Sequence, residues 1–237
     1  MRSSVDAETI LRATTDRLAN RPGDDAAHEL RARALLALGR LDEAEQDAAA
    51  AVRLDPDEVR YRELLAEVLA ARGAHRDAAL EFARLARYDP RQVAWTLAEA
   101  SEWLAAADGA QAVEAARQAV RLDPTNADAQ LVLARGLTRT GDASAALMAA
   151  GRAAELRPGD ASAREALADA LWLAGRDAEA FADFSQLAVK LTGMDRARVV
   201  VKARALYRQR AGWLGRLIAA LPPLFALALR RRWLVLR

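Results

Sequence analysis

The sequence predicts an all-α fold in which helix-turn-helix repeats stack into a solenoid, because several residue types recur at one fixed period. Five of the seven prolines lie 34 residues apart, and glycines and alanines keep the same register. A period of this size is typical of a repeat array, which usually presents an extended surface to a partner. The residues in register are Pro22, Pro56, Pro90, Pro124 and Pro158, then Gly39, Gly73, Gly141 and Gly175, then Ala44, Ala78, Ala112, Ala146 and Ala180.

Each 34-residue repeat is predicted to contain two helices joined by a short turn. In the fourth repeat, apolar residues between positions 127 and 139 lie at roughly the spacing of one helical face. Gly141 is expected to end this helix, because glycine accepts the left-handed backbone at a helix C-terminus. Asp142 or Ser144 then caps the second helix, which stops before Pro158. The expected caps of the other second helices are Asp42, Asp77 and Asp177.

The third and fifth repeats depart from this pattern. Ala107 stands where the other repeats have glycine, and the following pair, Asp108 and Gly109, predicts a displaced or longer turn. The fifth repeat ends at Leu191 and Thr192 without a proline. We therefore expect the third repeat to be the least regular of the five.

The pattern resembles the tetratricopeptide repeat family over about residues 25–192, as five repeats. The repeat length agrees, as do the Ala-x3-Phe steps and the closing Asp-Pro or Arg-Pro pairs. The resemblance implies a right-handed superhelical solenoid with a concave groove lined by the first helix of each repeat. The residues that carry it include Ala78 and Phe82, Ala180 and Phe184, Asp55-Pro56, Asp89-Pro90, Asp123-Pro124 and Arg157-Pro158, whereas the family's tryptophan position holds His28, Arg62, Thr96, Gln130 and Arg164.

The repeats are flanked by three further segments. Residues 1–24 are expected to form a half-repeat cap, with a helix from Asp6 to Ala19 whose stripe contains Ile10, Leu11, Thr14 and Leu18. Residues 193–211 predict a basic helix that caps the last repeat. Residues 212–237 form an apolar segment flanked by arginines.

The net charge of +2 conceals an uneven distribution along the chain. Residues 190–237 hold twelve lysines or arginines and one acid, Asp195, whereas the rest holds 23 basic and 32 acidic residues. This asymmetry indicates that the C-terminal part meets something acidic. The polar N-terminus predicts no secretory signal, and the richness in alanine and arginine favours a bacterial source. The expected location is the cytoplasm, with peripheral attachment to the inner face of the cell membrane as a hypothesis.

The sequence predicts a protein that is not an enzyme. Its only histidines, His28 and His75, fall at different positions of their repeats and are expected to lie on the surface or between helices. It has no phosphate-binding glycine loop, no nucleophile elbow and no cysteine. No cofactor and no metal site are therefore expected.

The resemblance places a protein- or peptide-binding groove on the first helices. Arg135 and Arg139, one helical turn apart, either grip a partner's carboxylate or pair with Glu165 or Asp169. Trp172 is either an anchor in the groove or a packing residue, and Trp95 and Trp103 are expected to pack. The groove residues implied are Arg33, Arg60, Glu63, Glu67, Leu97, Ser101, Leu104, Arg135, Arg139, Asp169 and Trp172.

The C-terminal segment leaves three interpretations open: membrane contact, docking to a protein partner or a second copy, and folding back on the array. The uncharged run from Leu217 to Leu229 is too short for a simple span and is broken by Pro222 and Pro223. No nucleic acid is expected. We predict a non-catalytic scaffold held at a membrane, with a subunit of a larger complex as the alternative. The docking residues predicted are Trp213, Leu217, Ile218, Leu221, Leu224, Phe225, Arg230, Arg231, Arg232 and Trp233.

Overall fold

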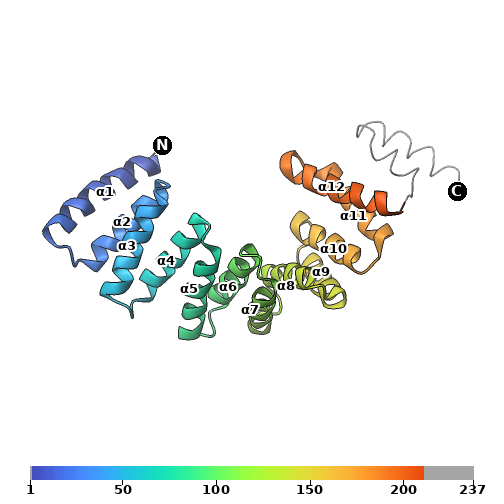
Figure 1. Cartoon of the computed structure of the whole chain (residues 1–237), viewed down its shortest axis with the longest axis horizontal. Coiled ribbons are helices and arrows are strands. Elements are labelled where there is room, and N and C mark those ends of the chain that lie inside the picture. Colours follow the sequence, from blue (N-terminus) through green and yellow to red (C-terminus); the bar gives the residue numbers. More distant parts are fainter. Residues whose placement is uncertain (1, 211–237) are drawn as a thin grey trace. The chain divides into compact units, whose positions relative to one another are not determined.

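The computed structural model describes residues 2–210 of the chain, with side chains from Asp6 to Gln209. These residues form twelve α-helices and no strand, which confirms the all-α repeat solenoid (Figure 1). The chain divides into an N-terminal unit, Met1–Gly136, and a C-terminal unit, Leu137–Arg237. The helices are α1 (Arg2–Asn20), α2 (Asp25–Ala37), α3 (Leu41–Leu54), α4 (Val59–Arg72), α5 (His75–Tyr88), α6 (Val93–Ala105), α7 (Gly109–Leu122), α8 (Ala127–Thr140), α9 (Ala143–Leu156), α10 (Ala161–Leu173), α11 (Asp177–Lys190) and α12 (Gly193–Arg210).

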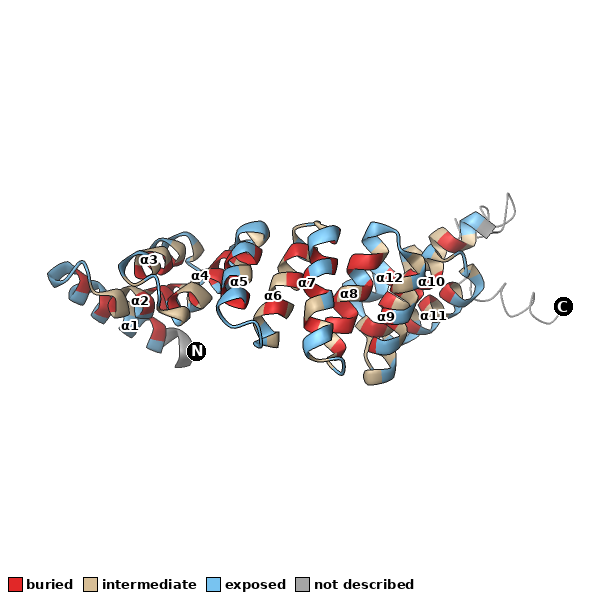
Figure 2. Ribbon diagram, turned by 90° about the horizontal axis from the view of Figure 1, so that it is seen from below, coloured by how far each residue is buried: buried red, intermediate tan, exposed pale blue. Residues whose placement is uncertain are grey.

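In the N-terminal unit, each helix from α1 to α6 packs on the next helix of the chain, and α2 also packs on α4. The contacts are made by small side chains at the predicted repeat positions. Ala32, Ala66 and Ala100 on the first helices are fully excluded from solvent. Figure 2 shows buried and exposed residues alternating along the helices, as expected for helices with one buried face. Small side chains at these positions let the helix backbones approach closely.

The C-terminal unit is built in the same way around a larger apolar cluster. Helix α10 packs between α9 and α11, and α12 packs on α11. The cluster includes Ala168 of α10, Phe184 of α11, and Val199 and Leu206 of α12, and all four side chains are fully buried. Helix α12 therefore completes the core of the last repeat.

The turn between the two helices of each repeat has the same geometry in all five repeats. The glycines at this position have φ values of 73°, 82°, 89° and 72°, and Ala107 has a φ of 64°. The next residue also repeats one hydrogen bond: the amide of Asp108 donates to the Trp103 carbonyl at 3.0 Å, as the amide of Asp142 does to that of Leu137. The expected displaced turn in the third repeat is therefore wrong. Backbone hydrogen bonding holds Ala107 in the left-handed conformation that glycine adopts elsewhere.

Replacing Ala107 with glycine should stabilise the protein by about 0.5–1 kcal/mol. A left-handed conformation costs an L-residue roughly 1–2 kcal/mol, and glycine removes this cost. The net gain is smaller, because glycine has a higher conformational entropy in the unfolded state. The reverse change, Gly141→Ala, serves as the control, because Gly141 has a φ of 89° and no heavy atom within 4 Å of an added Cβ. It should destabilise by a similar amount. Urea unfolding followed by circular dichroism measures both changes, and a loss of stability in Ala107→Gly would contradict the strain argument.

The residue that follows the left-handed position is the N-cap of each second helix. Asp142 and Asp108 occupy this site and accept hydrogen bonds from the amides of Ala145 and Gln111, which confirms the Asp142 cap. The caps predicted at Asp42, Asp77 and Asp177 are wrong, because these aspartates lie inside the first turn. The turn fixes the helix start, so the N-cap residues there are Arg40, Ala74 and Arg176. A first-turn aspartate still interacts favourably with the helix dipole.

Helix α1 packs on α2 in the half-repeat position. Thr14 and Leu18 of its predicted stripe are buried, and Leu11 is half-buried against the cluster formed by α2, α3 and α4. Ile10 differs from the expectation and is 42% exposed.

Candidate functional site

In the N-terminal unit, the predicted groove residues lie on α2, α4, α6 and α8. We refer to this set as the first-helix face. Its charged members Arg33, Arg60, Glu67 and Arg135 are exposed, whereas its remaining members are half-buried. The full set is Arg33 on α2, Arg60, Glu63 and Glu67 on α4, Leu97, Ser101 and Leu104 on α6, and Arg135 on α8.

Two arginines of this face share one buried carboxylate. Glu29 of α2 is 7% exposed, and its Oε1 accepts a hydrogen bond from Nε of Arg33 at 3.0 Å. The second oxygen, Oε2, lies 3.7 Å from an Nη1 of Arg60 on α4. Arg60 also lies over the ring of Tyr61, 5.1 Å from its centroid. The Nε of Arg60 also lies 3.5 Å from Oε2 of Glu58. Both guanidinium groups thus lie beside carboxylates, and about half of each side chain remains exposed.

The acidic part of the first-helix face lies on α4. The indole Nε1 of Trp95 on α6 donates a hydrogen bond to Oε1 of Glu63 at 3.0 Å, and Trp95 also packs against Ala66 and Phe82. Burial raises the pKa of Glu67, the charge of Arg33 opposes this, and the like charge of Glu63 adds to it. The charged form of Glu67 is therefore disfavoured relative to its protonated form, although the residue is exposed.

Removing the charge of Glu67 should stabilise the protein at neutral pH. A group whose pKa is higher in the folded state than in the unfolded state stabilises the protein fully at pH values below its unfolded-state pKa. This stabilisation is lost as the pH rises through the folded-state pKa. Glu67→Gln should therefore melt above the wild type at pH 7, and the difference should vanish near about pH 4, where unperturbed glutamate becomes protonated. Thermal melts across this range measure it, with the exposed Glu114→Gln on α7 as the control. A gain that persists at low pH would contradict the electrostatic cause.

The apolar part of the first-helix face lies on α6. Leu97 and Leu104 pack against the cluster that contains Ala100 and Val132, and both keep part of their surface in solvent. The hydroxyl of Ser101 donates to the carbonyl of Leu97 at 2.8 Å, within the helix. The face thus offers cations, carboxylates and apolar surface side by side, which suits recognition of a peptide.

In the C-terminal unit, α12 covers the acidic residues of the predicted groove. Arg198 donates two hydrogen bonds to Glu165, at 3.0 and 2.7 Å. The Nζ of Lys202 lies 2.8 Å from Glu165 Oε1 and 2.6 Å from Asp169 Oδ2. The cations shown beside these two acids come from α12, and the interpretation of Arg135 and Arg139 as groove residues stays a prediction. Arg139 is exposed.

The two cations of α12 also affect the pKa of Glu165. Burial by itself would raise the pKa, but hydrogen bonds from Arg198 and Lys202, together with their charges, lower it overall. Trp172 is also engaged within the unit: its ring lies edge-on to Phe184 at 6.4 Å, and its Nε1 donates to Gln209 at 3.2 Å. These contacts favour the packing interpretation of Trp172 over the groove anchor.

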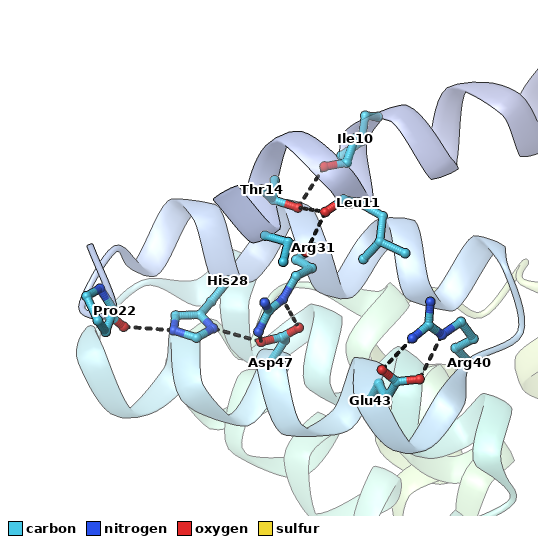
Figure 3. Close-up of polar contacts among 10 residues, drawn as sticks. Ile10, Leu11, Thr14, Pro22, His28, Arg31, Arg40, Glu43 and Asp47 are labelled. Carbon is cyan, nitrogen blue, oxygen red and sulfur yellow. Dashed lines mark hydrogen bonds and ion pairs between the residues drawn. The ribbon is translucent and has the colours of Figure 1, made fainter. Parts of the chain in front are cut away.

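Both histidines lie between helices and face carboxylates. His28 Nδ1 lies 2.8 Å from Asp47 of α3, and Arg31 donates two hydrogen bonds to the same carboxylate at 2.6 and 2.7 Å (Figure 3). His75 Nδ1 lies 2.8 Å from Glu102. The sequence did not reveal that the family's tryptophan position, which holds His28 in the first repeat, makes polar contacts between the two helices of a repeat. In the second repeat Arg62 there donates to Glu81 at 2.9 Å, so a polar contact between paired helices replaces an aromatic one.

The docking residues predicted between Trp213 and Trp233 lie outside the described residues. Within residues 2–210, no helix is both long and apolar enough to cross a membrane. The same part of the chain contains no group of three or more histidines, aspartates or glutamates arranged to hold a metal ion.

Comparison with known proteins agrees with the fold. A tetratricopeptide repeat protein from Parabacteroides merdae ATCC 43184 superimposes with a TM-score of 0.67 at 14% identity, over 88% of this chain and 92% of that one. MamA superimposes with a TM-score of 0.63 at 19% identity, over 70% and 91%. YrrB, described as a TPR protein with an unusual peptide-binding site, gives 0.55 at 16% identity, over 92% and 98%.

The sequence itself carries the family's signature. No curated protein matches the sequence. The sequence profile of the tetratricopeptide repeat matches residues 6–59, 30–93 and 97–161, which together make up more than half of the chain. The protein therefore belongs to the tetratricopeptide repeat family.

Proposed function

We propose that this protein is a scaffold that binds a protein or peptide partner on the first-helix face of its N-terminal unit. A repeat array of this kind serves protein–protein interaction by presenting an extended surface. The observation that supports this site most is the arrangement of Arg33 and Arg60, which are oriented by the buried Glu29 but remain half-exposed. Such preoriented guanidinium groups bind a carboxylate with little loss of side-chain entropy.

The chemistry of the face defines the partner it suits. An acidic side chain or a chain terminus would lie against Arg33 and Arg60, and a basic side chain against Glu67. An apolar side chain would cover the exposed parts of Leu97 and Leu104. Arg135 on α8 extends the basic part of this surface within the same unit. YrrB, which has a similar fold, is described as having a peptide-binding site, and this favours the same kind of partner here.

A charge swap tests this site while preserving the net charge. The variant Glu67→Lys/Arg135→Glu exchanges two exposed charges of the first-helix face, and the matched control Glu114→Lys/Arg117→Glu exchanges two exposed charges on α7. Partners recovered by quantitative pull-down with the wild type should be retained by the control and reduced at least about tenfold by the swap, since each lost charge contact is worth on the order of 1 kcal/mol. Equal recovery by both variants would exclude this surface.

We further propose that residues 212–237 hold the scaffold at the inner face of the cell membrane. The support lies in the sequence, where an uncharged run is flanked by Arg216 on one side and Arg230, Arg231 and Arg232 on the other. The alternative is a subunit of a larger complex with this segment buried in a partner enzyme. Flotation of the purified full chain with anionic vesicles favours the first proposal, whereas solubility only with a stoichiometric partner favours the second.

A further inference from the structure

Helix α12 carries a stripe of apolar and basic side chains on the side that faces away from the core. We call this set the outer stripe. Its residues are spaced three and four apart, so they share one face of the helix. Met194 is 86% exposed and Val201 is 64% exposed, which places them among the most exposed large apolar residues in the described part of the chain. The outer stripe consists of Met194, Ala197, Val201, Arg204 and Arg208.

The opposite side of α12 packs against the last repeat. Val199 and Leu206 are buried in its core, and Arg198 and Lys202 are bound by the acids of α10. The one acid of the helix, Asp195, lies 3.2 Å from Arg198. The inward cations of α12 are therefore neutralised by the protein itself.

The outward cations are not neutralised in this way. Among residues 2–210, neither Arg204 nor Arg208 of the outer stripe takes part in an ion pair or a side-chain hydrogen bond. The result is a helix with apolar side chains on both sides and unpaired charge of one sign on its outer side. A terminal repeat that only caps an array needs a polar outer face to stay soluble. The outer stripe therefore has the composition of a contact surface.

We propose that the outer stripe of α12 lies on an anionic lipid surface, with Met194 and Val201 inserted among the headgroups and Arg204 and Arg208 at the phosphates. An interfacial helix with apolar residues beside arginines is the arrangement that binds such surfaces. A second copy of the chain would bring like charge to the same face, which opposes self-association there. This inference is independent of the partner-binding proposal, because it concerns the C-terminal unit alone.

The first test measures binding of the full chain to vesicles of phosphatidylcholine, alone or mixed with phosphatidylserine. The variant replaces Arg204 and Arg208 with glutamine. The matched control replaces Arg87 and Arg121 with glutamine, two exposed arginines in the last turns of α5 and α7, and changes the net charge equally. The α12 variant should bind the anionic vesicles about tenfold to thirtyfold more weakly than the control, because each arginine near the surface contributes about a factor of five. Equal binding by both variants, or no binding of the wild type, would overturn the proposal.

The second test separates α12 from residues 211–237, which would also hold the chain on vesicles. The sequence contains no cysteine, so Met194→Cys can carry a single environment-sensitive fluorophore. The control label is placed at Met148 on α9 of the same unit, which is 69% exposed. On anionic vesicles the label at position 194 should shift to the blue and that at 148 should not. A bound chain whose label at 194 stays in water would show that the later residues bind alone. A response to soluble polyglutamate but not to vesicles would assign the stripe to an acidic protein. Either result would overturn the proposal.

Discussion

Replacing Ala168 with arginine is expected to unfold the last repeat. The side chain of Ala168 is fully excluded from solvent and lies in the cluster formed with Phe184 and Val199. An arginine there would overpack the contact by about 1–3 kcal/mol and would bury a charge without a partner, so the total loss should be about 4 kcal/mol or more. Ala134 in the N-terminal unit is equally buried, and the same change there should have the same effect.

Hydrogen exchange is the measurement suited to Ala168→Arg, because repeat arrays can unfold locally. The amides of α10 and α11 should lose protection in this variant. Ala182→Arg on α11 provides the control, since Ala182 is exposed and a surface change there should alter stability by no more than about 0.5 kcal/mol. Equal protection in the two variants would show that the repeat alanines do not lie at tight helix contacts.

Asp47→Ala should produce the second-largest loss of stability. The carboxylate of Asp47 is 6% exposed and holds both Arg31 and His28. Without it, the guanidinium group of Arg31, whose side chain is only 25% exposed, would lose the carboxylate that it pairs with. Breaking a fully buried pair costs about 3–5 kcal/mol, and the partial exposure of Arg31 reduces the expected loss to about 2–3 kcal/mol. Urea unfolding of the wild type and the variant measures this difference.

The sequence of the fourth repeat indicates which further substitutions should restore the stability lost in Asp47→Ala. Its equivalents of His28, Arg31 and Asp47 are Gln130, Leu133 and Ala149, so these three positions carry no charge in that repeat. Gln130 there donates to the carbonyl of Pro124 at 3.4 Å. The triple change His28→Gln/Arg31→Leu/Asp47→Ala should therefore recover stability to within about 1 kcal/mol of the wild type, because no charge is left unpaired. A triple variant as unstable as Asp47→Ala would show that the loss has another cause.

Much of the fold could be predicted from the sequence, because the information is periodic and local. Proline removes an amide donor and disfavours helical geometry in the residue before it, and glycine accepts the left-handed conformation, so the helix ends repeat with these residues. Alanine fits where two backbones approach closely, so the repeat period alone assigns Ala32, Ala66 and Ala100 to helix contacts, where all three are buried. The same periodicity placed Arg33, Glu63 and Leu97 on the first helices.

The tertiary structure decided which polar and charged groups pair with one another. Ala107 adopts the glycine conformation because the hydrogen bonds of the turn fix the backbone, a constraint that its residue type alone would not indicate. Glu165 and Asp169 are indistinguishable in sequence from other helix-surface acids, but they bind Arg198 and Lys202 because α12 packs on the last repeat. Glu29 likewise orients Arg33 and Arg60 because α2 and α4 are neighbours. Ion pairs depend on distances between groups far apart in the chain, and only the packing of the helices sets those distances.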